Sequence, residues 1–223
     1  MKRCLFVVAA IACLSSAQAV ILIDDFSSGA IDVVLTPPTN IVQVNRTGSM
    51  VGGSAFHDFG YVANAFGNSA RMKVNTSIPA MDVSGEFQVE TLLGLFYGVD
   101  STGQFNASDD LNLNLTGTDR FRMSVFHTDS IMNIAITLYD AETVYGPVQS
   151  FATLGPGYNQ NADFLFSSFG AFDFSDVDVI EIGIDVDPSA DYQVRQIAAV
   201  PEPATMSALG LGIAGLLTKR KRK

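Results

Sequence analysis

The chain has 223 residues and a formal net charge of −10, with 13 basic residues, 23 acidic residues and two cysteines. Residues 20–199 contain six basic and 22 acidic residues, which gives this part of the chain a formal charge of −16. Such an acidic surface argues strongly against binding to nucleic acid or to an anionic membrane surface, and it favours solubility or the binding of cations. A solubilising surface charge is the simpler interpretation.

Residues 1–19 have the three zones of a secretory signal peptide. These are a charged start at residues 2–3, an apolar core at residues 5–14, and small residues before the cleavage site, Ala17 and Ala19. The apolar core is too short to span a bilayer, which argues against the alternative of a membrane anchor. We therefore expect signal peptidase to cleave after Ala19.

The two cysteines, Cys4 and Cys13, both lie in this signal segment, so residues 20–199 contain none. An exported domain without disulfides depends on its hydrophobic core for stability. About 180 residues are enough for one sizeable core. Since no linker or internal repeat divides them, we expect one domain over residues 20–199.

Apolar and polar residues alternate with the period of a β-strand through most of residues 20–199. In the first half this pattern predicts strands at residues 20–26, 31–36, 41–44, 70–76 and 86–95. Pro37–Pro38 separates the second strand from the third, and we expect these two strands to flank a turn. We expect residues 48–54 to form a loop and residues 55–62 to be irregular.

In the second half the pattern predicts strands at residues 111–115, 120–126, 131–139, 141–151, 163–166, 179–186 and 192–197. The third and fourth of these should form a hairpin, and residues 172–177 should form a loop. About a dozen short strands separated by turn residues predict an all-β fold, a single β-sandwich of jelly-roll type. Phenylalanine, with 16 copies, should supply most of the aromatic core.

His57 and His127 are the only histidines, and neither has sequence neighbours that would complete a Ser–His–Asp site. Gly-x-Ser-x-Gly and His-Glu-x-x-His motifs are absent from the sequence. A paired-carboxylate glycosidase site stays open, because acids abound and no pair can be chosen among them. We predict no catalytic residues, expect both histidines to be ordinary surface or loop residues, and keep a glycan-active hydrolase as a less favoured exception.

Calcium is the metal that the acidic pattern favours, since it takes about six to eight oxygen ligands from carboxylates and carbonyls. Asp24 and Asp25 end the first predicted strand, whereas Asp185, Asp187 and Asp191 surround the final turn. The first and last strands of a jelly roll can be neighbours, so these five carboxylates could converge on one ion. The alternative, which the pattern favours over a metal site, is that they terminate strands and cap turns. No other cofactor is predicted.

Tyrosine rings are the candidates for stacking on sugars, since the chain has no tryptophan. The six are Tyr61, Tyr97, Tyr139, Tyr145, Tyr158 and Tyr192. Tyrosine serves equally well as a half-buried strand residue, and we favour that interpretation for most of them. The sequence therefore leaves the stacking residues unknown.

Residues 200–223 form a tail of three parts. Pro201-Glu202-Pro203 is stiff and extended, because proline fixes φ and has no N–H to donate. Residues 204–218 are uncharged and as a helix would span about 22 Å, less than the roughly 30 Å of a bilayer core. The basic residues 219–223 belong on the cytoplasmic side of a membrane. The alternative is a disordered, weakly apolar end with a basic tag.

This fixed order of parts closely resembles the PEP-CTERM sorting signal of exopolysaccharide-producing Gram-negative bacteria. Pro201-Glu202-Pro203 gives the name, residues 204–218 the short membrane span, and residues 219–223 the basic end. The resemblance implies export through the inner membrane, recognition and cleavage of the tail by a membrane transpeptidase-like exosortase, and a final place at the cell surface or outside the cell. It says nothing about residues 20–199.

The body has a second resemblance. Asp24-Asp25-Phe26, Phe172-Asp173-Phe174 and the last two predicted strands resemble the jelly-roll ectodomains common among PEP-CTERM proteins, and they are loosely similar to carbohydrate-binding modules. Two functions follow. The favoured one is a structural protein of the cell surface or extracellular matrix. The alternative is an extracellular carbohydrate-binding module, calcium-assisted or not, whose partner would be an exopolysaccharide.

Overall fold

The computed structural model describes residues 19–105, 109–140 and 147–201 of the chain. Within these ranges the alternating segments form thirteen strands and no α-helix, and two short 3-10 turns, η1 (Val51–Gly53) and η2 (Phe166–Phe169), complete the elements. Successive side chains of a strand point to opposite faces, so a strand with alternating residues can bury one face against a core. Most strands do this, as the burial of every second residue in β5 (Ala70–Asn75) illustrates.

The strands form two sheets, and within each sheet all neighbouring strands are antiparallel. The seven-stranded sheet has the order β11 (Gly157–Leu165), β8 (Arg120–Thr128), β13 (Asp191–Val200), β6 (Ala80–Gly85), β5, β2 (Ile31–Leu35), with β1 (Ile21–Asp24) also paired to β13. The six-stranded sheet has the order β10 (Val148–Leu154), β9 (Met132–Tyr139), β12 (Val179–Val186), β7 (Val89–Tyr97), β4 (Ser54–Asn64), β3 (Ile41–Thr47).

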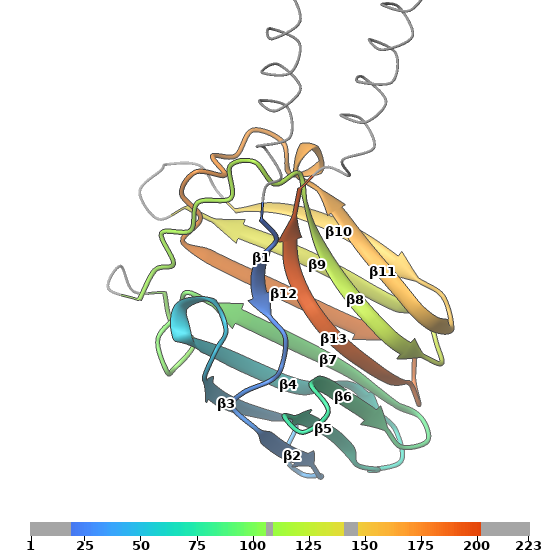
Figure 1. Cartoon of the computed structure of the whole chain (residues 1–223). Coiled ribbons are helices and arrows are strands. Elements are labelled where there is room, and N and C mark those ends of the chain that lie inside the picture. The colour runs from blue at the N-terminus through green and yellow to red at the C-terminus, as the bar shows by residue number, and fades with distance from the viewer. Residues whose placement is uncertain (1–18, 106–108, 141–146, 202–223) are drawn as a thin grey trace, which may run out of the picture.

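The chain passes repeatedly from one sheet to the other (Figure 1). Only β3–β4, β5–β6 and β9–β10 are hairpins within a sheet, and from β6 to β9 every connection changes sheet. This is the connectivity of a jelly roll, and it confirms the predicted fold class. The inner faces of both sheets share one hydrophobic core, which runs from Ile23 to Ala199. All described members of this core lie between residues 23 and 199, so we expect residues 20–200 to fold without the tail.

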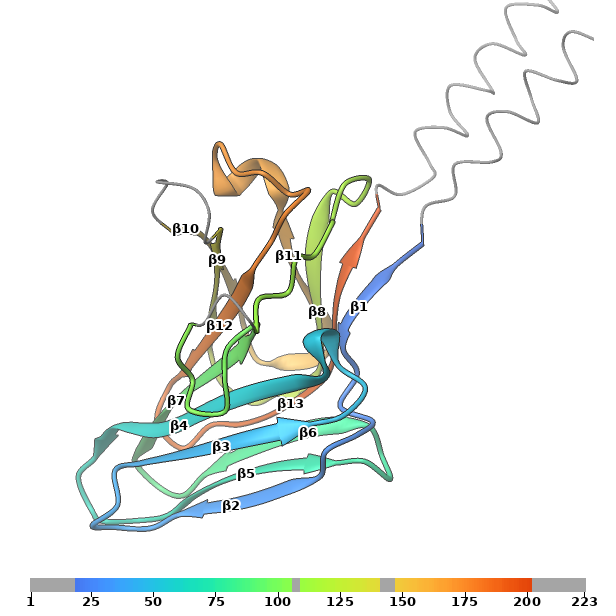
Figure 2. The ribbon, with the colours of Figure 1, turned by 90° about the vertical axis from the view of Figure 1, so that its left-hand side faces the viewer.

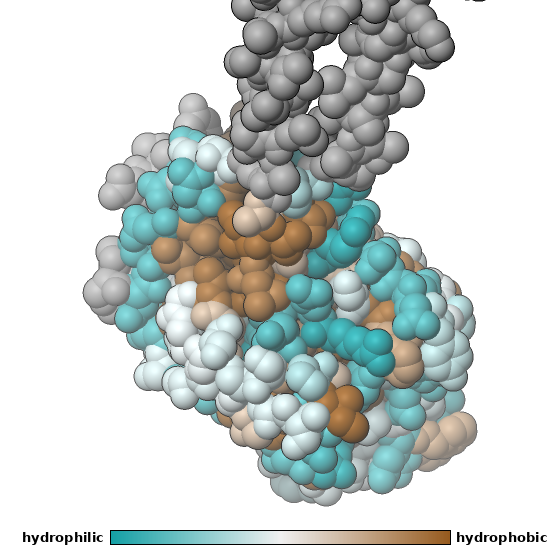
Figure 3. All heavy atoms as spheres, viewed as in Figure 1, coloured by the Kyte–Doolittle hydropathy of each residue, from teal (hydrophilic) through white to brown (hydrophobic). Residues whose placement is uncertain are grey.

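Both ends of the body lie together. β1 pairs with the last part of β13, with Ile21 opposite Ala199, and Figure 2 shows these two strands side by side. Figure 3 shows apolar residues gathered around β1, where Val20 is 53 % and Leu22 38 % exposed, while much of the face below them in this view is hydrophilic. The first residue of the predicted tail, Val200, is the last residue of β13, so no spacer separates the sandwich from Pro201.

Two predicted segments are wrong in type. Residues 55–62 were expected to be irregular, but they belong to β4, which is paired on both edges with β3 and β7. The alternation of apolar and polar residues is lost there because His57, a polar residue, is fully buried at a position that points into the core. Residues 111–115 alternate strictly, yet they form a loop with a single bridge between Leu113 and Val177. A loop that packs on the core buries every second residue as a strand does, as the fully buried Leu115 shows.

Two further differences concern boundaries and partners. The segment predicted as one strand at residues 86–95 is the turn after β6 followed by β7, and β6 itself was missed. A tight turn at Glu86–Gln88, with Gln88 at φ 60°, separates β6 from β7. β2 and β3 flank the cis Pro37–Pro38 bond as expected, but they lie in different sheets and pair with β5 and β4.

A buried polar cluster fixes β1 to the six-stranded sheet. Arg46 of β3, 1 % exposed, forms an ion pair with Asp24 at the end of β1. Its Nε donates to His57 Nε2 at 3.1 Å, and its Nη1 donates to the carbonyl oxygen of Ser28 at 2.8 Å. The hydroxyl of Tyr97 donates to Asp24 Oδ2 at 3.0 Å. The cluster thus joins four strands, since the guanidinium group of Arg46 in β3 contacts β1 and β4, and Asp24 links β1 to Tyr97 of β7. A buried charge needs such pairing to be tolerated.

The stability of this cluster should depend on pH through His57. Burial, together with the nearby positive charge of Arg46, lowers the pKa of His57 from 6.5 to about 3. The unfolded chain therefore binds one more proton than the fold below about pH 6.5, so the free energy of unfolding falls as pH falls. Between about pH 6.5 and pH 5 this histidine should lower the free energy of unfolding by about 2 kcal/mol.

The measurement is urea unfolding of wild type and His57→Gln across that pH range. Glutamine keeps an acceptor for Arg46 without a proton to gain, so the variant should lose less stability than wild type on acidification. Equal slopes of the unfolding free energy against pH would contradict the assignment.

Candidate functional site

The structure separates the acidic residues proposed as calcium ligands. Asp24 is in the buried ion pair with Arg46, and Asp25 Oδ1 accepts from the backbone N–H of Ser27 at 3.0 Å. β1 and β13 are neighbours as expected, but Asp24 lies opposite Ile197, six residues along β13 from Asp191. Asp24 therefore lies at one end of this pairing, and Asp191 lies beyond it, opposite Ser84 of β6.

The remaining three acidic residues do not form a metal site together either. Asp187 Oδ2 accepts from Ser130 Oγ at 3.1 Å, the backbone N–H of Asp191 donates to Asp129, and Asp185 faces outward from β12. Among the described residues, no group of three or more His, Asp or Glu side chains is placed to hold a metal ion. Calcium binding stays a prediction to which these residues lend no support.

The tyrosines and histidines considered as site residues are partly buried in the core and partly on the surface. Tyr97 and Tyr192 are core residues, and Tyr61 is half-buried with its hydroxyl donating to the carbonyl of Leu35 at 2.6 Å. Only Tyr139 and Tyr158 of the described tyrosines lie on outer faces with access to solvent, and Tyr145 lies outside the described residues. His57 is fully buried, so the expectation of a surface or loop histidine was wrong for it.

A groove crosses the outer face of the six-stranded sheet, and the middle of its floor is a row of three residues with little or no side chain. Gly94 of β7 is paired with Gly183 of β12, and Gly183 with Ala135 of β9. Asp58 of β4 lies next to Gly94, and Phe151 of β10 next to Ala135. Five strands at about 4.8 Å spacing make the whole floor roughly 19 Å long. We call this feature the glycine groove.

The walls of the glycine groove are partly apolar. Leu92, 47 % exposed, and Asp185 are cross-strand neighbours on one side of the floor, and Phe96 and Glu181 are neighbours on the other. A side-chain carbon added at Gly94 would come within 2.7 Å of the Phe96 ring, so that ring leans over the floor. The space divides into two adjoining hollows of about 540 and 370 Å³ that share Leu92 and Gly183. Hollows of this size are in the range of ligand sites.

Two carboxylates line the groove with an oxygen that has no hydrogen-bond partner. Asp58 Oδ1 borders the larger hollow and Asp185 Oδ1 the smaller one, and both atoms are buried and unpaired among the described residues. Burial, with a smaller contribution from Asp187, raises the pKa of Asp185. An unpaired buried oxygen costs about 1–3 kcal/mol. Both residues are partly exposed, so the other oxygen of each carboxylate is the one that can meet a ligand in the groove.

Glu181 in the groove wall is held in place. The hydroxyl of Tyr139 donates to Glu181 Oε2 at 2.5 Å, and burial together with this bond raises the pKa of Tyr139 to about 12. The groove therefore offers oriented acceptors beside flat apolar surface. Such a surface suits a ligand that carries hydroxyl donors on a ring with an apolar face.

Sequence reasoning missed this site, although a signal was present. Gly94 and Gly183 each stand between large apolar residues in a strongly alternating strand, at Leu93-Gly94-Leu95 and Ile182-Gly183-Ile184. Glycine inside a strand weakens it and often marks a place where a ligand approaches the backbone closely. What the sequence does not contain is the register that sets these two glycines side by side.

The end of the chain carries a recognisable signal. Residues 199–223 match the PEP-CTERM protein-sorting motif. This confirms the resemblance on which the tail prediction rested, and the motif indicates an exported protein that is sorted to the cell surface or the exterior with exosortase as processing partner. The body of the chain lies outside the match.

Most of the residues proposed for processing cannot be placed. Ala17, Glu202, Pro203 and the predicted span at residues 204–218 lie outside the described residues, whereas Ala19 and Pro201 flank the sandwich. In the part of the chain that the structure describes, no helix is long and apolar enough to cross a membrane.

Several solved structures share the sandwich architecture. The family 11 carbohydrate-binding module of cellulase Lic26A-Cel5E of Clostridium thermocellum is 13 % identical, covers 83 % of this chain and 96 % of its own, and gives a TM-score of 0.42. The family 30 module of Cel9D-Cel44B from the same organism is 13 % identical, covers 77 % of this chain and 98 % of its own, and gives a TM-score of 0.39. At these identities the likeness concerns the fold alone, and no ligand is carried over from it. No curated protein matches the chain.

Proposed function

We propose that this protein is an exported, exosortase-sorted component of the cell surface or extracellular matrix that binds a neutral polysaccharide chain in the glycine groove. The observation that supports it best is the open and partly apolar groove, whose two adjoining hollows are lined by Asp58 and Asp185. Both carboxylates are partly exposed, so sugar hydroxyls can donate to the oxygens that face the groove. The structural role expected from the sequence would then follow from attachment to the matrix glycan.

The shape of the groove supports a chain rather than a single sugar. Its floor runs across five strands from Asp58 to Phe151, and a length of roughly 19 Å accommodates several sugar rings. Leu92, Phe96 and the 71 % exposed Phe151 provide apolar surface against which ring faces can pack.

The charge of the groove supports a neutral glycan. Asp58, Asp185 and Glu181 line it, and residues 20–199 carry a formal charge of −16. Uronic acids and sulfated sugars would meet repulsion at close range, because the groove excludes part of the solvent that screens charge.

The test is a glycan array and calorimetric titration of residues 20–200 with cellohexaose, laminarihexaose, xylohexaose and a hexamer of galacturonic acid, each with and without calcium. We expect binding of at least one neutral hexamer and none of the acidic one. Failure of every neutral glycan in both conditions would overturn the proposal in favour of a structural role without glycan binding.

The two groove carboxylates should contribute to binding and not to stability. Asp58→Ala and Asp185→Ala should each weaken binding of the neutral hexamer by about tenfold or more, because each removes an acceptor for a buried hydroxyl. Neither change should lower the free energy of unfolding by more than about 1 kcal/mol, since each removes an oxygen that the fold leaves unpaired, and Asp185 loses in addition only a bond from the backbone N–H of Val186. Asp176→Ala, outside both hollows, is the control and should alter neither quantity. A variant that loses stability along with binding would mean that the carboxylate supports the fold instead.

The sorting part of the proposal has its own test. In cells that express the full chain, changing Glu202 to Ala or deleting residues 219–223 should leave the precursor uncleaved in the inner membrane. The fractionated cells are examined by immunoblotting for an epitope inserted in the body. Release of both variants at the wild-type level would show that the tail is not read in this way.

A further inference from the structure

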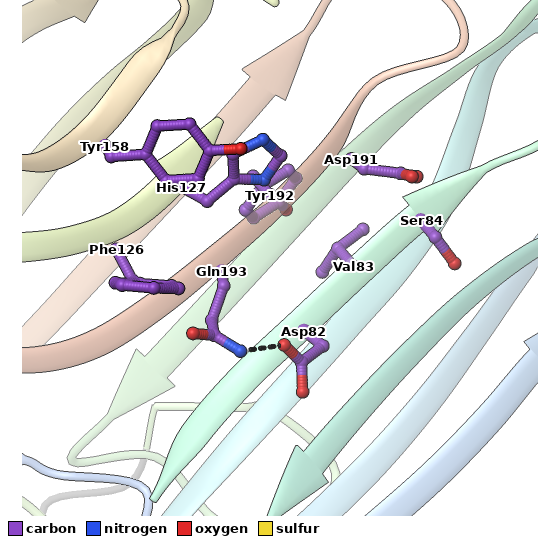
Figure 4. Close-up of a pocket in the computed structure, with 9 residues that line it drawn as sticks. All are labelled: Asp82, Val83, Ser84, Phe126, His127, Tyr158, Asp191, Tyr192 and Gln193. Carbon is purple, nitrogen blue, oxygen red and sulfur yellow. Dashed lines mark hydrogen bonds between the residues drawn. The ribbon is translucent and has the colours of Figure 1, made fainter. Parts of the chain in front are cut away.

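A second polar row lies on the opposite side of the sandwich. On the outer face of the seven-stranded sheet, Gln193 of β13 is paired with Asp82 of β6 and with His127 of β8, and His127 is paired with Tyr158 of β11. A hollow of about 390 Å³ opens over this row (Figure 4). We call it the Tyr158 hollow.

Two irregularities in the sheet shape this hollow. The register between β8 and β13 shifts twice, around Val194, so that Phe126 and Arg195 are each an extra residue in their strand. Bulges of this kind re-aim side chains, and here they place Phe126 beside His127 on the outer face. The guanidinium group of Arg195 lies 3.8 Å from the centre of the Phe126 ring and covers it.

The resulting wall is aromatic. The Tyr158 ring centre is 4.8 Å from that of His127 and 6.1 Å from that of Phe126, so two neighbours support it. Despite these contacts Tyr158 is 68 % exposed. Figure 4 shows its ring lying against the imidazole of His127. A supported ring with an open face is the arrangement that stacking on a ligand requires, because little conformational freedom is left to lose.

The floor of the hollow supplies polar groups at fixed positions. Gln193 Nε2 donates to Asp82 Oδ1, which orients both side chains, and Ser84 and Asp191 stand opposite each other at one end. Burial and the charge of Asp129 raise the pKa of Asp191. Carboxylate, amide and hydroxyl groups beside an open aromatic face match a sugar, and the two carboxylates disfavour an acidic one.

We propose that the Tyr158 hollow is a second carbohydrate site, which takes one neutral sugar residue stacked on Tyr158 and hydrogen-bonded to Asp82 and Gln193. This rests on the proposed function, because it extends glycan binding from one face of the protein to both. The glycine groove and the Tyr158 hollow lie on outer faces of different sheets, so one molecule can hold two polysaccharide chains. Such a protein cross-links its matrix, and binding at two sites makes the attachment much stronger than either site alone.

The test maps binding by nuclear magnetic resonance on ¹⁵N-labelled residues 20–200, titrated with cellohexaose, laminarihexaose and xylohexaose. We expect shifts at the amides of Gly94 and Gly183 and, independently, at those of His127 and Tyr158. Tyr158→Ala should abolish only the second set, with binding there weakened by about tenfold or more. Phe87→Ala is the matched control, since Phe87 is equally exposed, at 67 %, and lines neither hollow.

A second readout tests bivalency directly. Wild type should cross-link the soluble polymer of the sugar that binds, seen as turbidity, and Tyr158→Ala should still bind that polymer without cross-linking it. Shifts confined to the groove would overturn the second site and leave the proposed function intact. Shifts confined to the Tyr158 hollow would overturn the groove assignment instead. Absence of shifts at both with every hexamer would overturn both proposals.

Discussion

Replacing Arg46 with Met is expected to lower the free energy of unfolding by about 3–5 kcal/mol. The side chain is fully buried, and its loss would leave Asp24 charged and unpaired in the interior. The same change removes a donor from His57 and from the carbonyl of Ser28. Because the guanidinium group joins β1 and β3, the first strand should detach in this variant before the rest of the sandwich unfolds. Urea unfolding and amide hydrogen exchange at Ile21–Asp24 measure the two effects.

Two further variants separate the buried pair from the general effect of losing an arginine. Arg71→Met removes a similar Arg–Asp pair with Asp32 on the outer face, where both side chains are about half exposed, and it should cost at most about 1 kcal/mol. Asp24→Asn combined with Arg46→Met removes the buried charge, so the double variant should be more stable than Arg46→Met alone. Equal losses for Arg46→Met and Arg71→Met would show that burial of the pair contributes nothing.

This cluster also shows where reasoning from the sequence ends. Asp24 was interpreted as a strand terminator or a calcium ligand, and Arg46 was given no role. Their pairing joins residues 22 positions apart in different sheets, and no local pattern encodes such a contact. His57 was placed at the surface for the same reason, since its partner Arg46 was not known. Period-two alternation, in contrast, reports burial of one face, and it was enough to predict the sandwich.

The two candidate sites could not be predicted from the sequence for a related reason. Each depends on register: Gly94 beside Gly183 in one sheet, and His127 beside Tyr158 in the other. The residues of each site come from four or five strands and are up to 127 positions apart, as Asp58 and Asp185 illustrate. By contrast, the sorting motif is contiguous, and residues 199–223 could be recognised from their order alone.

Replacing Gly183 with Val should abolish binding of neutral hexasaccharides in the glycine groove. Gly183 lies at the point where the two hollows meet, and a side-chain carbon added there meets nothing within 4 Å. The first carbon of a valine side chain would therefore stand in the groove without contacting a protein atom. Because valine is favoured in strands and glycine weakens them, the free energy of unfolding should stay equal or rise by about 1 kcal/mol. Calorimetric titration and urea unfolding measure the two quantities.

The expected loss of glycan binding without a loss of stability distinguishes a ligand-binding role of Gly183 from a structural one. A glycine inside a central strand, where a side-chain carbon has open space and valine is favoured, is explained by a ligand that lies on that strand. Gly155→Val is the matched control, since Gly155 also has open space around it but lies in a turn outside both hollows, and it should leave binding unchanged. Undiminished binding by Gly183→Val would place the ligand elsewhere on the molecule. Gly94→Val is less informative, because its side chain would collide with the Phe96 ring and disturb the wall as well as the floor.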